Sequence, residues 1–132
     1  MGCLNSIRVL GLSAALAFAA SPVIKVDFDM SGRNSSEVTE PNYVPWVVSG
    51  VASKDTMLSG VKVNVAGSAN LKANWYKAGV QSPSYARLVC DGVMVEGGGA
   101  ITLTFSNLAA GTHSLLLYLN NVDGTAVSNS ID

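Results

Sequence analysis

Apolar and polar residues alternate along most of the chain after Pro22, and this two-residue period is typical of β-strands that are buried on one face. In residues 60–67, for example, valines fall on one face, while lysine and asparagine fall on the other. Residues 112–120 are apolar on both faces, which indicates a central strand of a packed structure. The pattern predicts strands over residues 23–29, 60–67, 71–77, 100–107 and 112–120, with a further strand through Leu88 and Cys90.

Short runs rich in glycine, serine or aspartate separate these segments, and such residues favour tight turns. We expect turns at residues 66–68, 91–92, 97–99, 109–111 and 123–124. Many short strands at this spacing, without a helical period to supply crossovers, predict an all-β fold, namely an antiparallel β-sandwich. Residues 126–132 look like the beginning of another strand, so we expect a module that is truncated at its C-terminus.

The N-terminal segment has the order of a secretory signal peptide. Arg8 precedes an apolar run over residues 9–18, and Ala17 and Ala19 form an A-x-A cleavage pattern. Because the run is too short to span a bilayer, we expect cleavage after Ala19 and a secreted module over residues 20–132 that has no membrane anchor. The alternative is N-myristoylation, since the first six residues fit the M-G-x-x-x-S pattern.

Composition excludes some classes of partner and site. The charged fraction is 13%, about half of the roughly 25% in typical soluble domains. The 8 basic residues are balanced by 9 acidic ones, so no basic field attracts phosphates and nucleic acid is not expected as a partner. Cys90 is the one cysteine left after cleavage and cannot form an intrachain disulfide. We interpret it as a small apolar strand residue.

Catalytic motifs are scarce in this sequence. His113 is the only histidine, and its position at the start of a strand indicates a structural residue. The chain has no zinc-ligand cluster, nucleophile elbow or phosphate-binding loop. Glu37 and Glu40 lie in a polar loop over residues 31–50, and a pair of carboxylates can hydrolyse a glycosidic bond. We expect a non-catalytic module, with a lyase or hydrolase site in this loop as the alternative.

Two aspartates indicate a metal ion. Asp27 and Asp29 alternate on one face of the first predicted strand, and loops at the edge of a sandwich supply the carboxylate oxygens that bind structural calcium. The other interpretation is that both aspartates belong to the solvated face of the strand. We expect no other cofactor.

Aromatic residues near the predicted turns favour carbohydrate binding. A sugar presents an apolar ring face and a rim of hydroxyls, so its binding site needs exposed rings beside planar polar groups. We nominate four residues of these types as carbohydrate contacts, Trp46, Tyr76, Arg87 and Asn120. Trp75, by contrast, falls on the apolar face of its strand and is expected in the core.

Three longer phrases carry a resemblance to a class of secreted module. The strings "DFDMSGRNSSEVTEPNYVPW", "ANWYKAGVQSPSYARLVCDGV" and "LAAGTHSLLLYLNNVDG" resemble the N-terminal β-sandwich of secreted, pectate-lyase-like proteins that degrade polysaccharides. The last strand is similar to that of malectin-like and galactose-binding-like jelly rolls. The resemblance implies a non-catalytic jelly-roll module that binds a polysaccharide or oligosaccharide beside a catalytic domain of the same parent chain. A structural spacer between domains is a third interpretation.

Overall fold

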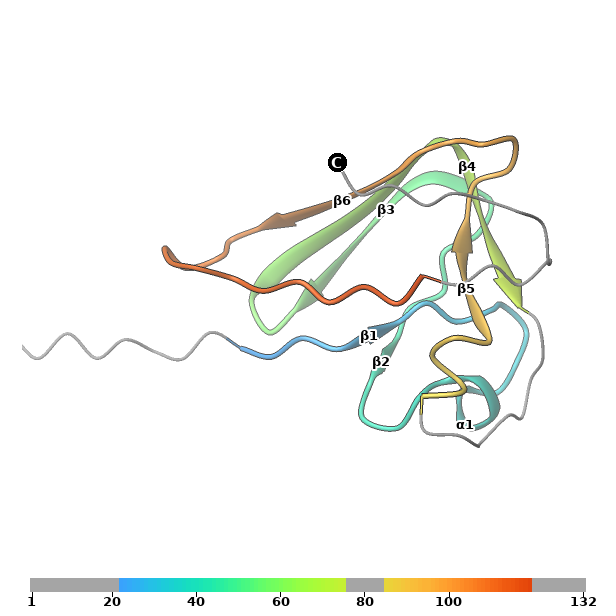
Figure 1. The fold of residues 1–132 in the computed structure, drawn as a ribbon, viewed down its shortest axis with the longest axis horizontal. Helices are drawn as coiled ribbons and strands as arrows, with labels where there is room; N and C mark the ends of the chain where they lie inside the picture. Colours follow the sequence, from blue (N-terminus) through green and yellow to red (C-terminus); the bar gives the residue numbers. More distant parts are fainter. Residues whose placement is uncertain (1–21, 76–84, 120–132) are drawn as a thin grey trace, which may run out of the picture.

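The computed structural model describes residues 22–75 and 85–119 of the chain. In order, these residues form β1 (Val26–Asp27), α1 (Ser35–Val38), β2 (Val44–Pro45), β3 (Val51–Leu58), β4 (Val61–Trp75), β5 (Asp91–Met94) and β6 (Ile101–Ser106) (Figure 1). The strands dominate and almost no helix is present, so the all-β prediction is confirmed for the described residues. Among these residues, no helix has the length and apolar character needed to cross a membrane.

β4 is the strand to which the rest of the larger sheet is attached. Its first half pairs with β3 on one side and with β6 on the other, and its second half pairs with β5. All three pairings are antiparallel, as the sequence predicted. Ser59 and Gly60 connect β3 to β4 and both have positive φ angles, 50° and 83°, which matches the twist of a two-residue hairpin.

The predicted turn at residues 66–68 is wrong, because β4 passes through it as a continuous strand. The ladder with β3 is irregular there instead. Ser53 pairs with Ala66 and Val51 pairs with Leu71, so the four residues of β4 between these pairs lie against a single residue of β3. The glycine and serine that suggested a turn therefore mark a bulge, at which the pairing of β4 passes from β6 to β5.

The hydrophobic core joins the larger sheet to β1 and to the segment around β2. Its buried side chains are Trp46, Val48, Val61, Val63, Val65 and Leu71. In β4 the valines lie on one face, as the alternating pattern predicted, and Phe105 and Leu103 lie opposite Val63 and Val65 in the register of β6. Burial of each such side chain stabilises the fold by roughly 1.5–3 kcal/mol relative to exposure.

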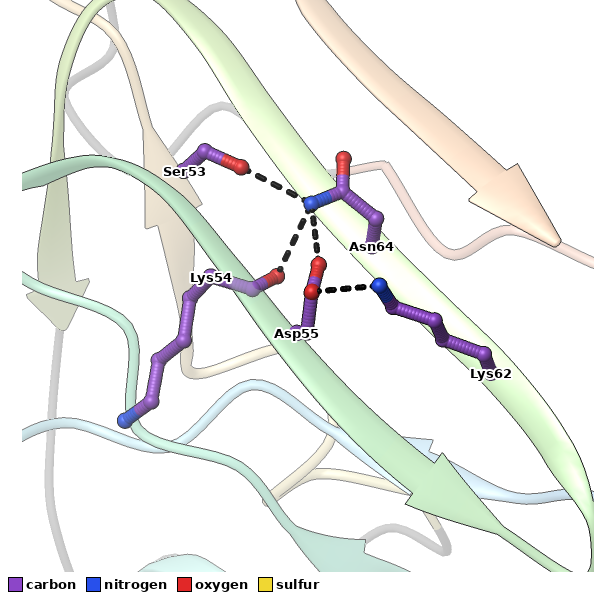
Figure 2. A network of polar contacts seen from close by, with 5 residues as sticks. All are labelled: Ser53, Lys54, Asp55, Lys62 and Asn64. Carbon is purple, nitrogen blue, oxygen red and sulfur yellow. Dashed lines mark hydrogen bonds and ion pairs between the residues drawn. The ribbon is translucent and has the colours of Figure 1, made fainter. Parts of the chain in front are cut away.

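The opposite face of β3 and β4 is polar, and its side chains fix the register of the pair. Asn64 lies opposite Asp55, and its Nδ2 donates to Asp55 Oδ1 and, at 2.8 Å, to Ser53 Oγ (Figure 2). Lys62 Nζ lies 2.7 Å from the other carboxylate oxygen of Asp55. A slip of one residue would break these contacts and turn the valines of β4 toward water.

Several predicted strands differ from the observed elements. β1 has only two residues, and it pairs with β2 in parallel. Residues 85–90 form turns, and β5 begins at Asp91, where the sequence predicted a turn. The reason is tertiary: residues 91–94 find β4 as a hydrogen-bonding partner, whereas residues 85–90 pack against the segment after α1.

Residues 112–119 are not the buried central strand that their composition predicted. They have no regular secondary structure, and Leu115, Leu116 and Leu119 are 60%, 75% and 55% exposed. A strand that is apolar on both faces is buried only where elements cover both faces. In the described part of the chain, β6 pairs with β4 and no strand pairs with β6 on its other side.

Candidate functional site

The candidate site begins with two aspartates of the first strand segment. Val26 and Phe28 pack against the core, so the alternation of an extended chain turns Asp27 and Asp29 the other way. The loop that contains α1 then covers them. Asn34 begins the helix, since its Oδ1 accepts a hydrogen bond from Ser36 N at 3.1 Å, a typical N-cap.

Asp91 joins these two residues to form the carboxylate cluster (Asp27, Asp29 and Asp91). One oxygen from each side chain lies within 4.8 Å of the other two. Asp27 and Asp29 are only 1% and 2% exposed, so their assignment to a solvated strand face is wrong. Asp91 was missed as a site residue, because the Asp-Gly pair at residues 91–92 indicates a turn and no sequence spacing relates residue 91 to residue 27.

Each carboxylate of the cluster is held through one oxygen only. Oδ2 of Asp27 accepts a hydrogen bond from Glu40 N at 2.7 Å, and Oδ2 of Asp29 accepts one from Thr39 Oγ1 at 2.5 Å. Oδ2 of Asp91 accepts one from Met30 N at 3.2 Å. The second oxygen, Oδ1, is buried on all three residues and has no hydrogen-bond partner in the described structure.

The negative charge of the carboxylate cluster is not balanced by a neighbouring cation in the described residues. Burial raises the pKa of Asp27 to about 6 and that of Asp91 to about 7, and repulsion between the carboxylates contributes to both of these raised values. Burial also raises the pKa of Asp29. Within residues 22–75 and 85–119, no lysine or arginine forms an ion pair with the three carboxylates. The cluster can therefore accept protons or a cation.

Trp75 lies beside the carboxylate cluster, where it faces solvent. It is directly opposite Asp91 in the β4–β5 ladder and is 42% exposed, so its expected place in the core is wrong. The apolar face of β4 continues past the bulge with Leu71 in the core, but at Trp75 the guanidinium carbon of Arg33 lies 5.4 Å from the ring centre. Together with Glu37, Arg87 and Asp91, Trp75 lines a narrow recess that has no room for a water molecule.

Three tyrosines form a second aromatic group, the tyrosine cluster (Tyr43, Tyr85 and Tyr118). The rings of Tyr85 and Tyr118 stack with their centres 5.9 Å apart, and these residues are 50% and 41% exposed. Burial and a hydrogen bond with Tyr118 raise the pKa of Tyr43, and Lys25 Nζ lies 5.7 Å from the Tyr43 ring centre. Tyr43 and Tyr85 lie a few residues along the chain from Val38 and Arg87, which line the Trp75 recess, and Tyr118 belongs to the irregular segment after β6.

The structure corrects one of the four nominated carbohydrate contacts. Trp46 is only 6% exposed and stacks on Phe28 with 5.3 Å between ring centres, so it offers no ring to a ligand. The cause is that Trp46 N donates to Asp27 O at 2.7 Å, which draws this residue onto β1. Arg87 is half-buried, and its Nη1 donates to Thr39 O at 3.2 Å. Tyr76, Asn120 and the predicted signal peptide over residues 1–19 lie outside the described residues.

The residues considered for catalysis have different surroundings in the described structure. Glu37 is exposed at the edge of the Trp75 recess, whereas Glu40 is half-buried and holds Asp27 through its backbone N–H. His113 lies in an irregular segment with its Nε2 2.9 Å from Ala109 O, rather than at the start of a strand. Cys90 lies in the turn before β5.

Comparison of the chain with protein-family models, with curated proteins and with solved structures finds no match. The chemical roles of the carboxylate cluster, the Trp75 recess and the tyrosine cluster therefore have to be inferred from their own geometry, burial and charge.

Proposed function

We propose that this chain is a non-catalytic carbohydrate-binding module of the antiparallel β-sandwich type, exported from the cell and attached to a polysaccharide-degrading domain. The observation that carries the proposal is the exposure of three rings, namely Trp75 beside Glu37 and Arg87 in the recess, and the stacked pair Tyr85 and Tyr118. Trp75, Tyr85 and Tyr118 are each more than two-fifths exposed, although large aromatic side chains contribute most to stability when they are buried.

Polar groups of the kind that hydrogen-bond to sugar hydroxyls lie beside these rings. Glu37 and Arg87 line the same recess as Trp75, and the phenol groups of the tyrosine cluster add further donors and acceptors. The recess itself has no room for a ligand, so a sugar would lie across the exposed rings rather than within a cavity. Binding of this kind buries little area against the entropic cost of association, and we expect weak affinity for each sugar unit.

Isothermal titration of the full chain with pectin, rhamnogalacturonan and galactan fragments tests the proposal. We expect heat with at least one of these glycans, and a loss of affinity of about tenfold for Trp75→Ala or Tyr85→Ala. Met57→Ala is the matched control, because Met57 is a large side chain that is 58% exposed on β3 and lies outside both aromatic groups. Absence of heat with every glycan, or equal losses in all three variants, would contradict the proposal.

The same samples separate the proposed module from a catalytic one. A non-catalytic module releases no unsaturated or reducing sugar from these polysaccharides. Release that disappears in Glu37→Gln and in Glu40→Gln would instead support the lyase or hydrolase alternative.

A further inference from the structure

We infer that the carboxylate cluster is a calcium site, in which one Ca²⁺ binds to the Oδ1 atoms of Asp27, Asp29 and Asp91. This inference goes beyond the proposed carbohydrate binding and does not depend on it.

The hydrogen bonds of the carboxylate cluster leave one oxygen of each carboxylate free to act as a metal ligand. In each aspartate, Oδ2 is fixed by a donor from Met30, Thr39 or Glu40, and Oδ1 is left without a partner among the described residues. Buried polar atoms without partners are rare in folded proteins, because each one forfeits its hydration. The three Oδ1 atoms belong to three carboxylates that each place one oxygen within 4.8 Å of an oxygen of the other two, and together they indicate a common missing partner.

That missing partner is a cation rather than another hydrogen-bond donor. Asp27 and Asp29 are almost completely buried, and the described residues supply no ion pair to the cluster. Uncompensated buried carboxylates are costly, and attraction to a divalent ion replaces their lost hydration. Protons are the competing solution, since the carboxyl groups of Asp27 and Asp91 retain them to unusually high pH.

The donor set selects calcium among the common divalent ions. All three metal ligands would be carboxylate oxygens, which suit hard cations, whereas zinc sites in proteins use mostly histidine and cysteine. Magnesium keeps several waters and is usually held by one or two carboxylates in strict octahedral geometry. Calcium accepts more carboxylate ligands in less regular arrangements, so three aspartates from two separate segments, two of them buried, favour Ca²⁺.

A bound Ca²⁺ would fasten together parts of the chain that are distant in sequence. Asp27 and Asp29 belong to the first strand segment, and Asp91 begins β5, more than sixty residues later. Their partners Thr39 and Glu40 lie in the loop after α1, so the same ion would also hold that loop in place. Because Trp75 pairs with Asp91, the ion would fix one side of the Trp75 recess as well.

Calcium titration of the full chain after removal of metal with EDTA tests the inference. We expect isothermal titration to show one Ca²⁺ bound per chain. Its dissociation constant should be no larger than about 10⁻³ M, the value of the weakest protein calcium sites. At a concentration 100 times the dissociation constant, the unfolding equilibrium constant should fall about 100-fold, seen as a higher midpoint of thermal unfolding. Terbium emission that is sensitised by tryptophan and displaced by Ca²⁺ is an independent readout of the same site.

Asp29→Asn and Asp91→Asn should abolish both the calcium heat and the calcium-dependent rise in midpoint. Neither variant needs calcium to fold, since each removes a buried charge, and their midpoints in EDTA should be no lower than that of the unmodified chain. Asp55→Asn is the matched control, with the same change at a half-exposed carboxylate outside the carboxylate cluster, and it should keep the full response to calcium.

Three results would overturn the inference. The first is absence of calcium binding by the unmodified chain, which would leave protons as the partners of the carboxylate cluster. The second is a calcium response that survives in both Asp29→Asn and Asp91→Asn, because the ion would then bind elsewhere. The third is an equal or larger response to MgCl₂, which would remove the assignment to calcium. A calcium response without sugar binding would uphold this inference while contradicting the proposed function.

Discussion

At the scale of single residues, the two tryptophans occupy environments opposite to those their sequence contexts indicate. Trp46 follows a proline in a polar loop and is nearly fully buried against Phe28, whereas Trp75 ends an alternating strand and is 42% exposed. The local pattern describes which side of a strand a residue faces, but it does not show which elements cover that side. Trp46 is covered by the β1 segment. Among the described residues, the group that lies over the Trp75 ring is the guanidinium of Arg33.

This contrast predicts different costs for the same substitution. Trp46→Ala should lower the free energy of unfolding by roughly 3–5 kcal/mol, because it removes a large side chain from the core. Trp75→Ala should lower it by less than about 1 kcal/mol, since only partial burial and a cation–π contact are lost. Urea unfolding followed by circular dichroism measures both values, and a larger cost at Trp75 would show that the assigned environments are reversed.

Asp55 gives a prediction about pH. Hydrogen bonds from Lys62 and Asn64 hold the pKa of this carboxyl below its ordinary value of 3.8. A lowered pKa means that the folded state binds the proton less tightly than the unfolded state, so the contribution to stability is present above pH 3.8 and is lost as pH falls through the lowered value. Carboxyl-carbon NMR should show Asp55 titrating below pH 3.8 in the folded chain.

Breaking the Lys62 contact should return the Asp55 pKa toward 3.8, and Lys62→Met makes this change while keeping a long side chain. Lys72→Met is its control, because Lys72 pairs with Glu96 at 2.7 Å and has no contact with Asp55 among those the structure gives. An upward shift of the Asp55 pKa in both variants would mean that general charge, rather than this contact, sets the value.

At the scale of the elements, the bulge in β4 depends on Gly67. A Cβ at this position would lie 2.5 Å from Ala69 O and 2.9 Å from both Leu71 Cδ2 and Val95 Cγ2. The first of these neighbours is a backbone atom, and the other two belong to side chains that are packed in or against the core, so the chain near the bulge would have to move. Glycine is thus required here by close approach, in the middle of a strand where it otherwise lowers stability.

Gly67→Ala should therefore destabilise the fold by about 1–3 kcal/mol through overpacking. Gly92→Ala is the matched control, because Gly92 also lies in a strand that pairs with β4 and a Cβ there would meet no atom within 4 Å. This control should be neutral or more stable by up to about 1 kcal/mol, since alanine restricts the unfolded chain. Equal effects in chemical denaturation of the two variants would argue against a steric role for Gly67.

The two-residue period predicted β4 and β6 well, but it failed for residues 112–119. The valines of β4 and the alternation of β6 indicated both the strands and the buried face, because a strong two-residue period reflects burial directly. The same reasoning failed at residues 112–119, where leucines on both faces predicted a central strand. Pairing partners and covering elements are properties of the tertiary structure, and no local pattern of residues 112–119 contains them.

At the scale of the whole molecule, the candidate site combines residues that sequence reasoning can nominate with residues that it cannot. The alternation of Asp27 and Asp29 and the chemistry of carboxylates were sufficient to nominate these two residues for a metal. Asp91 was not nominated, because its approach depends on the antiparallel pairing of β5 with β4 and on the hydrogen bond from Met30. The exposure of Trp75 and the stacking of Tyr85 on Tyr118 likewise depend on contacts between segments that are distant in sequence.

The position of β4 in the sheet also has a consequence for folding of the chain during its synthesis on the ribosome. β3 and β4 are made early and can close as a hairpin, but one long flank of β4 receives β5 and β6 only after residues 91–106 have been synthesised. Until then, the row of valines on β4 lacks Leu103 and Phe105 and is covered only by earlier segments of the chain, so it stays partly accessible to other nascent chains or to a chaperone. A pause in translation before residue 106 would prolong that vulnerable interval, so codon choice across β5 and β6 would influence the yield of folded protein.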